Sequence, residues 1–313
     1  MDENSKILIL GGSGLLGSAI NRTLINQGFE NILLPRRKEL NLLERKDVGN
    51  YLRENKPEYV FMAAGLVGGI EANRNKPADF LYQNSMMILN LLECVKNENP
   101  QSKILYPGST CIYPRENPQP INEERFLSGK LEETNKGYAI AKIMGITACQ
   151  TYNKQYGLET ICVQPTNLYG PKDNYNLETG HMIPSLIKKI LLAKENKEKI
   201  NLWGTGTPRR EALYSEDCAD AIVYLMKNHN SSDIINIGTG FDYSIKEFAE
   251  IIQKEIGDTN KIEWDLSKPD GTFEKRTDIQ KLKRIYPEYN PRSFKEGLKE
   301  ILSNEKEMSR IRG

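Results

Sequence analysis

Short apolar segments alternate with helix-length amphipathic segments along the first half of the chain, and this alternation restricts the fold more than any other feature. Five segments rich in aliphatic residues lie at Lys6–Leu10, Asn31–Leu34, Tyr59–Met62, Lys103–Tyr106 and Thr160–Val163. Between them, apolar residues recur at helical spacing over Ser18–Gln27, Lys46–Asn55, Ala78–Asn97 and Tyr138–Tyr156. Strands that alternate with helices predict an α/β fold, a doubly wound parallel sheet with right-handed crossovers and helices on both faces.

The character of the sequence changes after about Pro165. Loops rich in Gly, Pro and Asn now separate short helical stretches such as Met182–Lys194 and Ile245–Ile256. No internal repeat or low-complexity linker divides the chain. We therefore expect a smaller C-terminal α/β lobe that packs against the first part.

The charge balance excludes several classes of function. Among 313 residues, 43 Lys and Arg face 42 Asp and Glu, a formal charge of +1. This balance provides no broad basic surface for nucleic acid or an anionic membrane. The polar start, Met1 to Lys6, leads through Ile7–Leu10 directly into glycines, which resembles neither a signal peptide nor a membrane span. We expect a cytoplasmic protein with no nucleic-acid or membrane partner.

The cysteines indicate neither a disulfide framework nor a zinc site. There are five, an odd number, and their spacing matches no common ligand pattern; they are Cys94, Cys111, Cys149, Cys162 and Cys218. We expect free thiols in a reducing compartment, and no metal.

Gly11, Gly14 and Gly17 form a G-x-x-G-x-x-G pattern between the first predicted strand and the first predicted helix. Glycine permits a tight turn and lets the backbone approach a pyrophosphate, while the helix N-terminus supplies positive dipole. The pattern predicts a Rossmann-type dinucleotide site. A glycine-rich turn that binds nothing is the alternative interpretation.

Basic residues follow the second predicted strand, in the segment Leu33-Leu-Pro-Arg-Arg-Lys38. A dinucleotide fold that binds NAD usually has an acidic residue here, for the ribose hydroxyls. A guanidinium instead suits a 2′-phosphate, so the segment favours NADP, with Arg37 as the main contact. A basic, solvated loop is the alternative.

Tyr138 and Lys142 are four residues apart, so they share one face of a predicted helix. A neighbouring ammonium favours the phenolate and is expected to lower the tyrosine pKa toward neutrality. Ser109 follows the fourth predicted strand, at the sheet edge where ligands of open α/β folds bind. A Tyr-x-x-x-Lys pattern alone is common by chance, whereas the combination with Ser109 and the glycine-rich turn is specific.

With these motifs, the chain resembles the extended short-chain dehydrogenases/reductases, and among them the GDP-L-fucose synthase family. The similarity runs nearly from end to end. The segments that carry it are Val67–Asn73, Pro77–Asn84, Gly108–Pro114, Tyr138–Ile143, Pro165–Pro171, His181–Pro184, Trp203–Pro208, Asn236–Gly240 and Ser267–Thr272.

The resemblance implies a reduction in which NADPH delivers hydride to C4 of a GDP-4-keto sugar and Tyr138 protonates the C4 oxygen. Ser109 would hydrogen-bond the same oxygen, and Lys142 would hold the nicotinamide ribose. Cys111 and His181 would serve as base and acid for epimerisation at C3 and C5. Taken alone, Cys111 could be a small buried apolar residue and His181 a hydrogen-bonded loop residue, while His229 is expected in a surface turn without a role.

The resemblance also implies the remaining binding residues. Those for the cofactor are Gly11, Gly12, Ser13, Gly14, Leu15, Leu16, Gly17, Arg37, Asn41, Leu42, Ala63, Ala64, Lys142, Pro165, Thr166, Asn167, Leu168 and His181. Those for the substrate are Ser109, Asn167, Lys189, Trp203, Arg210 and Asp270. A core tryptophan is the alternative for Trp203. Lys189 departs from the family pattern, which has arginine there and with it a bidentate clamp; Ser13 replaces an arginine that can occur near the adenosine phosphate, and Gly65 a larger, basic residue.

These expectations combine into one hypothesis with two alternatives. Residues 1–165 would form the NADP-binding Rossmann domain, with segments near 211–240 returning to it, and residues 166–313 mainly the GDP-sugar lobe. The product would be GDP-L-fucose or a related GDP-sugar, made by a homodimer. One alternative is a C4 reductase of a GDP-4-keto-heptose, or of another GDP-4-keto sugar, without epimerase activity. The other is a non-catalytic NADP-binding protein.

Overall fold

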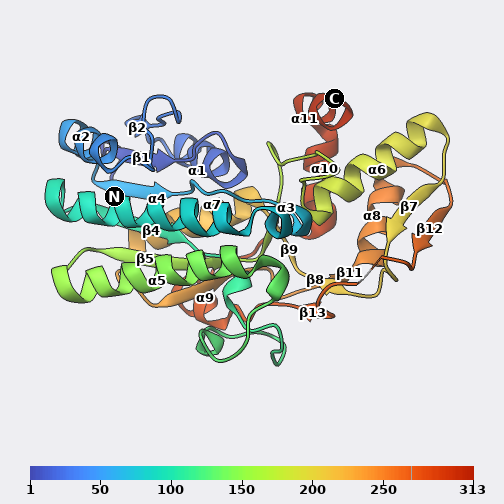
Figure 1. Ribbon diagram of the computed structural model, residues 1–313. Coiled ribbons are helices and arrows are strands. Elements are labelled where there is room, and N and C mark those ends of the chain that lie inside the picture. The colour runs from blue at the N-terminus through green and yellow to red at the C-terminus, as the bar shows by residue number, and fades with distance from the viewer. Residues whose placement is uncertain (269) are drawn as a thin grey trace.

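The computed structural model describes residues 1–268 and 270–313; Pro269, part of the Ser267–Thr272 segment, lies outside the described residues. A six-stranded sheet, with every neighbouring pair parallel, has the order β10-β5-β4-β3-β1-β2. Its strands are β1 (Ile7–Leu10), β2 (Ile32–Leu33), β3 (Tyr59–Met62), β4 (Lys103–Pro107), β5 (Thr160–Pro165) and β10 (Ile234–Ile237). The predicted Rossmann-type doubly wound sheet is confirmed (Figure 1).

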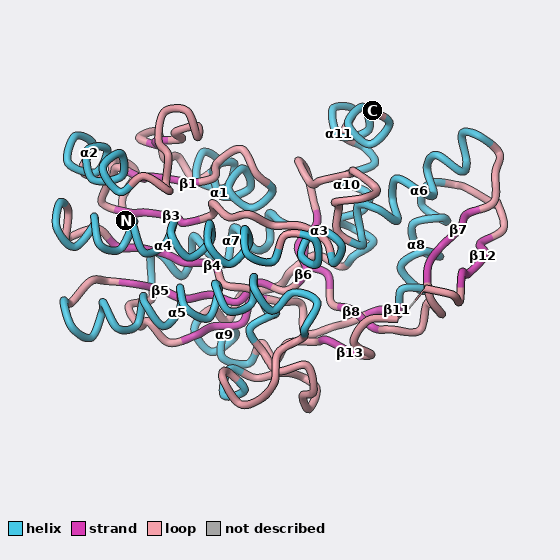
Figure 2. Tube along the Cα trace, viewed as in Figure 1, coloured by secondary structure: helices cyan, strands magenta, loops and turns pink. Residues whose placement is uncertain are grey.

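Helices cover both faces of this sheet, as Figure 2 shows. On one face lie α2 (Arg45–Asn55), α4 (Pro77–Glu98) and α5 (Lys136–Tyr156). On the other lie α1 (Leu15–Asn26), α7 (Ser215–Asn228) and α9 (Gln280–Ile285). Successive side chains of each strand alternate between the faces, so a strand buried on both sides must be apolar throughout.

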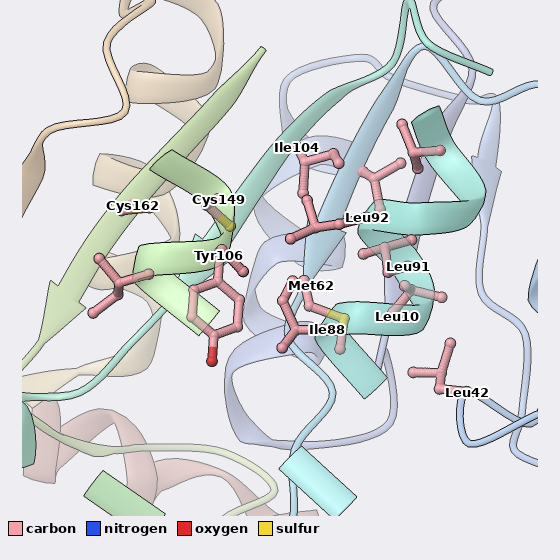
Figure 3. Packing of buried hydrophobic residues seen from close by; sticks show 14 of the residues in the cluster. Leu10, Leu42, Met62, Ile88, Leu91, Leu92, Ile104, Tyr106, Cys149 and Cys162 are labelled. Carbon is pink, nitrogen blue, oxygen red and sulfur yellow. The ribbon is translucent and has the colours of Figure 1, made fainter. Parts of the chain in front are cut away.

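The alternation is visible along β1. Leu8 and Leu10 belong to the cluster under α4 and α5, whereas Ile7 and Ile9 belong to the cluster under α1 and α7. Figure 3 shows the first of these clusters, in which α4 packs its apolar face on the middle of the sheet. The continuous apolar strands of the sequence therefore reflect burial from both sides.

Strands and helices begin and end close to the positions expected from the sequence. The main differences are at the second strand, where β2 is only two residues long, and at α3 (Ile70–Asn75), which the sequence did not indicate. An edge strand has only one neighbour to pair with, and a six-residue helix is too short for a periodic pattern. His229, expected in a surface turn, directly follows α7 and is half-buried.

The second part of the chain forms a smaller lobe, at the right of Figure 1. Its helices are α6 (Met182–Asn196), α8 (Ile245–Ile256), α10 (Phe294–Ser303) and α11 (Glu305–Arg312). Its strands are β6 (Asn167–Tyr169), β7 (Ile200–Trp203), β8 (Arg209–Arg210), β9 (Ala212–Tyr214), β11 (Tyr243–Ser244), β12 (Ile262–Asp265) and β13 (Glu274–Lys275). They make three small sheets, β11-β8-β13, β12-β7 and β6-β9.

Aromatic side chains fill the core of this lobe. The ring centroid of Phe294 lies 5.2 Å from that of Tyr169 and 4.6 Å from that of Phe248, in tilted and edge-to-face arrangements. The chain enters the lobe through β6, directly after β5, and returns to the large sheet through α7 and β10. Within the described part of the chain, no helix combines the length and the apolar character needed to cross a membrane.

Close contact between α5 and β4 provides a test of this packing. A Cβ atom on Gly145 would lie 2.3 Å from the hydroxyl oxygen of Tyr106, whose side chain is enclosed by the core. Gly145→Ala should therefore lower the free energy of unfolding by about 1–3 kcal/mol, measured by chemical denaturation.

Gly49→Ala in α2 is the matched control. Its new Cβ would have its nearest neighbour, the Cys94 sulfur, at 3.7 Å, an ordinary contact distance. Because alanine favours a helix over glycine, this variant should be neutral or more stable by up to about 1 kcal/mol. Equal destabilisation by both variants would contradict the packing argument.

Candidate active site

The glycine-rich turn between β1 and α1 has no room for a side chain at Gly11 or Gly17. Gly11 has a φ of +82°, and a Cβ there would lie 2.6 Å from the backbone nitrogen of Ala64. A Cβ on Gly17 would lie 2.3 Å from the carbonyl oxygen of Gly11. Gly14 caps α1 without a side-chain hydrogen bond, and the first turn of α1 has no acidic residue. The helix therefore presents free N–H groups and positive dipole, which fits the pyrophosphate of a dinucleotide.

Other residues predicted to bind the cofactor surround this turn. Arg37 follows β2 with its side chain exposed. Asn41 accepts a hydrogen bond from the N–H of Leu43 at 3.2 Å, and the carbonyl of Leu42 accepts one from Asn90 at 2.9 Å. Ala63 and Ala64 directly follow β3, beside the turn. Gly12, Ser13, Leu15 and Leu16 lie in the turn itself or in the first turn of α1.

The carboxyl end of β5 supplies the next group, Pro165 to Leu168. Thr166 donates its N–H to the carbonyl of Ile237, the last residue of β10, at 3.0 Å. Asn167 is exposed, and its amide donates to the carbonyl of Glu211 at 2.8 Å. This connection joins the end of the large sheet to the strands of the smaller lobe.

Ser109, Tyr138 and Lys142 converge just beyond β4. Ser109 caps the short 3₁₀ helix Thr110–Ile112. Lys142 donates a hydrogen bond of 2.8 Å from Nζ to the carbonyl of Pro107, the last residue of β4. The same Nζ lies 5.7 Å from the centroid of the Tyr138 ring. The structure therefore brings these three side chains together, as the sequence predicted for the carboxyl edge of the sheet.

Burial controls the protonation of these groups. It raises the pKa of Tyr138 well above its ordinary value of 10.0, a thiolate at Cys111 would add to the rise, and a hydrogen bond with Ser109 opposes it. Burial also lowers the pKa of Lys142 to about 8. The expectation that an ammonium would bring the Tyr138 pKa toward neutrality is wrong for this structure, because desolvation dominates. Tyr138 is a protonated phenol, the form required of a proton donor.

Cys111 lies deep in the same group. It is 6% exposed, and its N–H is hydrogen-bonded to the Ser109 hydroxyl at 3.4 Å. Burial raises the pKa of the Cys111 thiol, while the ammonium of Lys275, the Ser109 hydrogen bond and the Lys142 ammonium lower it. This burial agrees with either interpretation of Cys111, as a small core residue or as a reactive thiol.

His181 approaches from the smaller lobe, where it caps α6. The loop before it is attached to the start of α3, since Gly69 donates its N–H to the carbonyl of Thr179 at 3.2 Å. Partial desolvation by the neighbouring protein lowers the pKa of the imidazole, although His181 as a whole keeps an exposed surface. Within residues 1–268 and 270–313 the imidazole makes no hydrogen bond to another protein group.

Apart from Ser109, which follows β4, the predicted substrate residues lie on the smaller lobe. Trp203 is 61% exposed, so the alternative of a core tryptophan is wrong. The ammonium groups of Lys189 and Lys268 lie 5.2 Å and 5.4 Å from its ring centroid. Asp270 accepts hydrogen bonds from the N–H and the hydroxyl of Thr205, at 3.0 Å and 2.7 Å.

Arg210 lies in β8 and is half-buried. Burial lowers the pKa of Arg210, and the charge of Asp270 opposes that effect. The register of the small sheet places Lys275 of β13 directly beside Arg210. Two cations thus stand next to each other on parallel strands that face the site.

A family model provides the first comparison with known proteins. The model described as the NAD dependent epimerase/dehydratase family matches residues 7–238. The chain belongs to this family. The matched range contains both the glycine-rich turn and the group of Ser109, Tyr138 and Lys142.

Individual relatives agree with this membership. A GDP-L-fucose synthase from Sinorhizobium fredii is 46% identical over 281 residues, which cover 90% of this chain and 89% of that protein. A GDP-L-fucose synthetase from Naegleria fowleri, solved bound to NADP, has a TM-score of 0.89 at 28% identity and covers 96% of this chain and 93% of its own. A GDP-mannoheptose C4 reductase from Campylobacter jejuni, with NADP bound, has a TM-score of 0.87 at 33% identity, covering 99% of each chain. The resemblance to the GDP-L-fucose synthase family is thereby confirmed.

Two residues that lie at the site, Lys275 and Gln164, were not predicted from the sequence. Lys275 is close enough to Cys111 and Arg210 for each to influence its pKa, which burial lowers. Gln164, fully buried at the end of β5, accepts the N–H of Ser109 at 2.8 Å. A Cβ on Gly108 would lie 2.0 Å from the Gln164 oxygen, so glycine is required there. The sequence contains one hint of this kind: Lys275 lies three residues beyond the family segment Ser267–Thr272, close enough to be considered as a substrate contact.

The depressed pKa of Lys142 predicts a pH-dependent stability. Its ordinary value is 10.5 and its value in the fold is about 8, so the unfolded chain binds the proton more tightly. The resulting penalty on the folded state is complete below the lower value and disappears as the pH rises toward the higher one. Lys142→Met removes the penalty, so its stability relative to wild type should fall by about 3 kcal/mol between about pH 7 and about pH 10.5.

Thermal and chemical unfolding at several pH values would measure this difference. Lys154→Met, an exposed position in the same helix, is the control and should follow the wild-type pH profile. Parallel profiles for Lys142→Met and wild type would mean that the ammonium is not desolvated.

Proposed function

We propose that the protein reduces the C4 ketone of a GDP-4-keto sugar with NADPH. The observation that carries this proposal is the convergence of Ser109, Tyr138 and Lys142 at the carboxyl edge of the sheet, the same edge at which the glycine-rich turn follows β1. The relatives support the substrate class, because they are named for GDP-sugar synthesis or reduction. A non-catalytic NADP-binding protein would have no need to bury an ammonium beneath a protonated phenol.

The chain provides the groups that hold the cofactor. The N–H groups of the glycine-rich turn would bind the pyrophosphate, and Arg37 would bind the 2′-phosphate. Lys142 donates one hydrogen bond to Pro107, which leaves two N–H donors for the hydroxyls of the nicotinamide ribose. When bound, NADPH supplies the hydride for C4.

Tyr138 and Ser109 would act on the ketone oxygen. Tyr138 is protonated because burial raises its pKa, so it can transfer its proton as negative charge develops on the oxygen. The Ser109 hydroxyl would donate a second hydrogen bond to that oxygen. Gln164 fixes the backbone of Ser109 and so keeps this donor in place before the substrate arrives.

The GDP portion would lie along the smaller lobe. Arg210, Lys275 and Lys189 provide cations for the diphosphate, and the exposed face of Trp203 suits stacking against a base. Asn167 and Asp270 complete the predicted contacts. We propose residues 1–165 as the NADP-binding domain, with segments near 211–240 returning to it, and residues 166–313 mainly as the substrate lobe.

Cys111 and His181 would carry an epimerisation that precedes the reduction. Carbons C3 and C5 both lie next to the C4 ketone, so the donors that stabilise an alkoxide at C4 also stabilise an enolate there. The charges of Lys275 and Lys142 act against burial to favour the Cys111 thiolate. His181, at the start of α6, would return the proton. The homodimer and the cytoplasmic location stay predictions.

Tyr138→Phe tests the proposed proton donor. Loss of the hydroxyl should lower kcat by about 10²- to 10⁴-fold, while the affinity for NADPH, measured by fluorescence titration, stays close to that of wild type. Tyr156→Phe, on the exposed end of the same helix, is the matched control and should keep full activity. Unchanged turnover in Tyr138→Phe would refute the assignment.

The choice of sugar is tested by two substrates. NADPH oxidation should proceed with GDP-4-keto-6-deoxymannose, because the pair Cys111 and His181 is present for the epimerisation that leads to GDP-L-fucose. Turnover confined to a GDP-4-keto-heptose would refute GDP-L-fucose as the product and would support the alternative, a C4 reductase without epimerase activity.

Solvent deuterium tests the epimerase step separately from reduction. Wild type should incorporate deuterium at C3 and C5 of the product, detected by mass spectrometry, and Cys111→Ser should lose most of this exchange. Cys218→Ser is the control and should exchange as wild type does. Cys218 is a buried thiol of α7, in the core on the other face of the large sheet. Reduction without exchange in wild type would restrict the protein to a reductase.

A further inference from the structure

Glu211 is a fully buried carboxylate that links the large sheet to the smaller lobe. It follows β8 directly and is 0% exposed. One oxygen, Oε1, accepts the N–H groups of Thr239 and Gly240, at 2.6 Å and 2.7 Å. The other, Oε2, accepts the N–H and the hydroxyl of Thr277, at 2.8 Å and 2.7 Å. The carboxylate thus binds the turn after β10 to the segment after β13.

The backbone of Glu211 holds the same region from its other side. Its N–H donates to the carbonyl of Lys275 at 3.3 Å, and its carbonyl accepts the amide of Asn167 at 2.8 Å. Arg210 is its immediate neighbour in the chain. Three residues proposed to contact the substrate, from β6, β8 and β13, are therefore attached to this single position.

The small sheet cannot fix these residues by itself. Strands β8 and β13 are two residues long, and such short pairings have little stability of their own. The Glu211 carboxylate continues the connection past the end of β13, through Thr277. It also requires glycine at position 238, where a Cβ would lie 2.3 Å from Oε1 and 2.3 Å from the Thr277 hydroxyl.

A carboxylate is the group that suits this position. Both oxygens face donors, and the backbone N–H groups of Thr239, Gly240 and Thr277 cannot turn away. A glutamine of the same shape would place its NH₂ against N–H groups in either orientation. One side would then lose its hydrogen bonds and leave buried donors without partners.

We propose that Glu211 is the positioning residue that sets Arg210, Lys275 and Asn167 in register for the diphosphate of the GDP-sugar. It does not touch the substrate; it acts through the residues attached to it. This inference rests on the proposed function and extends it to a residue whose role is to align the substrate site.

Isothermal titration with GDP, together with steady-state kinetics, tests the proposal. Glu211→Gln should weaken GDP binding and raise KM for the GDP-sugar by about tenfold or more, because the cations lose their alignment. NADPH affinity should fall much less than GDP affinity, since Asn167 is the one residue of this aligned set that is also a predicted cofactor contact and the glycine-rich turn lies apart from these strands. A merely structural role would lower stability without this selective loss of GDP affinity.

Asp217→Asn is the matched control. Asp217 is also a buried carboxylate that accepts a backbone N–H, that of Arg292 at 2.8 Å, but it belongs to α7 and holds none of the proposed substrate contacts. This variant should lower stability and keep GDP affinity. Equal loss of GDP affinity in Asp217→Asn and Glu211→Gln would overturn the proposal.

A second pair of variants decides the question if Glu211→Gln fails to fold. Thr277→Val removes one hydrogen bond to Oε2 and should weaken GDP binding by about threefold, whereas Thr277→Ser keeps the hydroxyl and should restore it. Equal GDP affinity in these two variants would overturn the proposal, as would a folded Glu211→Gln with normal GDP affinity or with an equal loss of NADPH affinity. Wild type that binds no GDP would instead refute the proposed function.

Discussion

The packing of α5 against β4 is the constraint on which the arrangement of reactive groups depends. Gly145 lets the helix lie directly on Tyr106. Lys142, about one turn earlier, then reaches the carbonyl of Pro107 at the end of β4, and Tyr138, a further turn back, meets Ser109. A displaced helix would separate the phenol from the hydroxyl even if every residue type were kept. The reactive geometry is therefore a property of the sheet and its covering helix, and the loops beyond it are built on that base.

Desolvation acts on the two titratable groups of this arrangement in opposite directions. It raises the pKa of Tyr138 and lowers that of Lys142, each toward the neutral form. The phenol is thereby kept as an acid. At neutral pH the ammonium is still mostly charged, because its pKa of about 8 lies above that pH. Burial therefore keeps Tyr138 as a proton donor beside the cationic Lys142, and it lowers the stability of the fold.

Much of the fold and part of the site could be read from the sequence, because those features depend on local patterns. Apolar runs separated by helical periodicity predicted the sheet, and the spacing of Tyr138 and Lys142 predicted a shared helix face. The roles of Lys275, Gln164 and Glu211 could not be predicted. Each meets the site through partners distant in the chain, such as Ser109 for Gln164. The sign of the Tyr138 pKa shift also depends on burial, which no spacing of residues reveals.

The two proposed reactions place different demands on the structure. Ser109, Tyr138 and Lys142 all belong to β4, α5 and the segment between them, so the groups for reduction are held by the large sheet alone. Cys111 lies with them, but His181 is delivered by the smaller lobe, at the end of a loop fastened to Gly69. Epimerisation therefore requires both lobes in register, whereas reduction requires only that the sugar be presented to one. A change confined to the loop before His181 would therefore alter epimerisation. It would leave Tyr138, the proton donor for reduction, in the position that β4 and α5 give it.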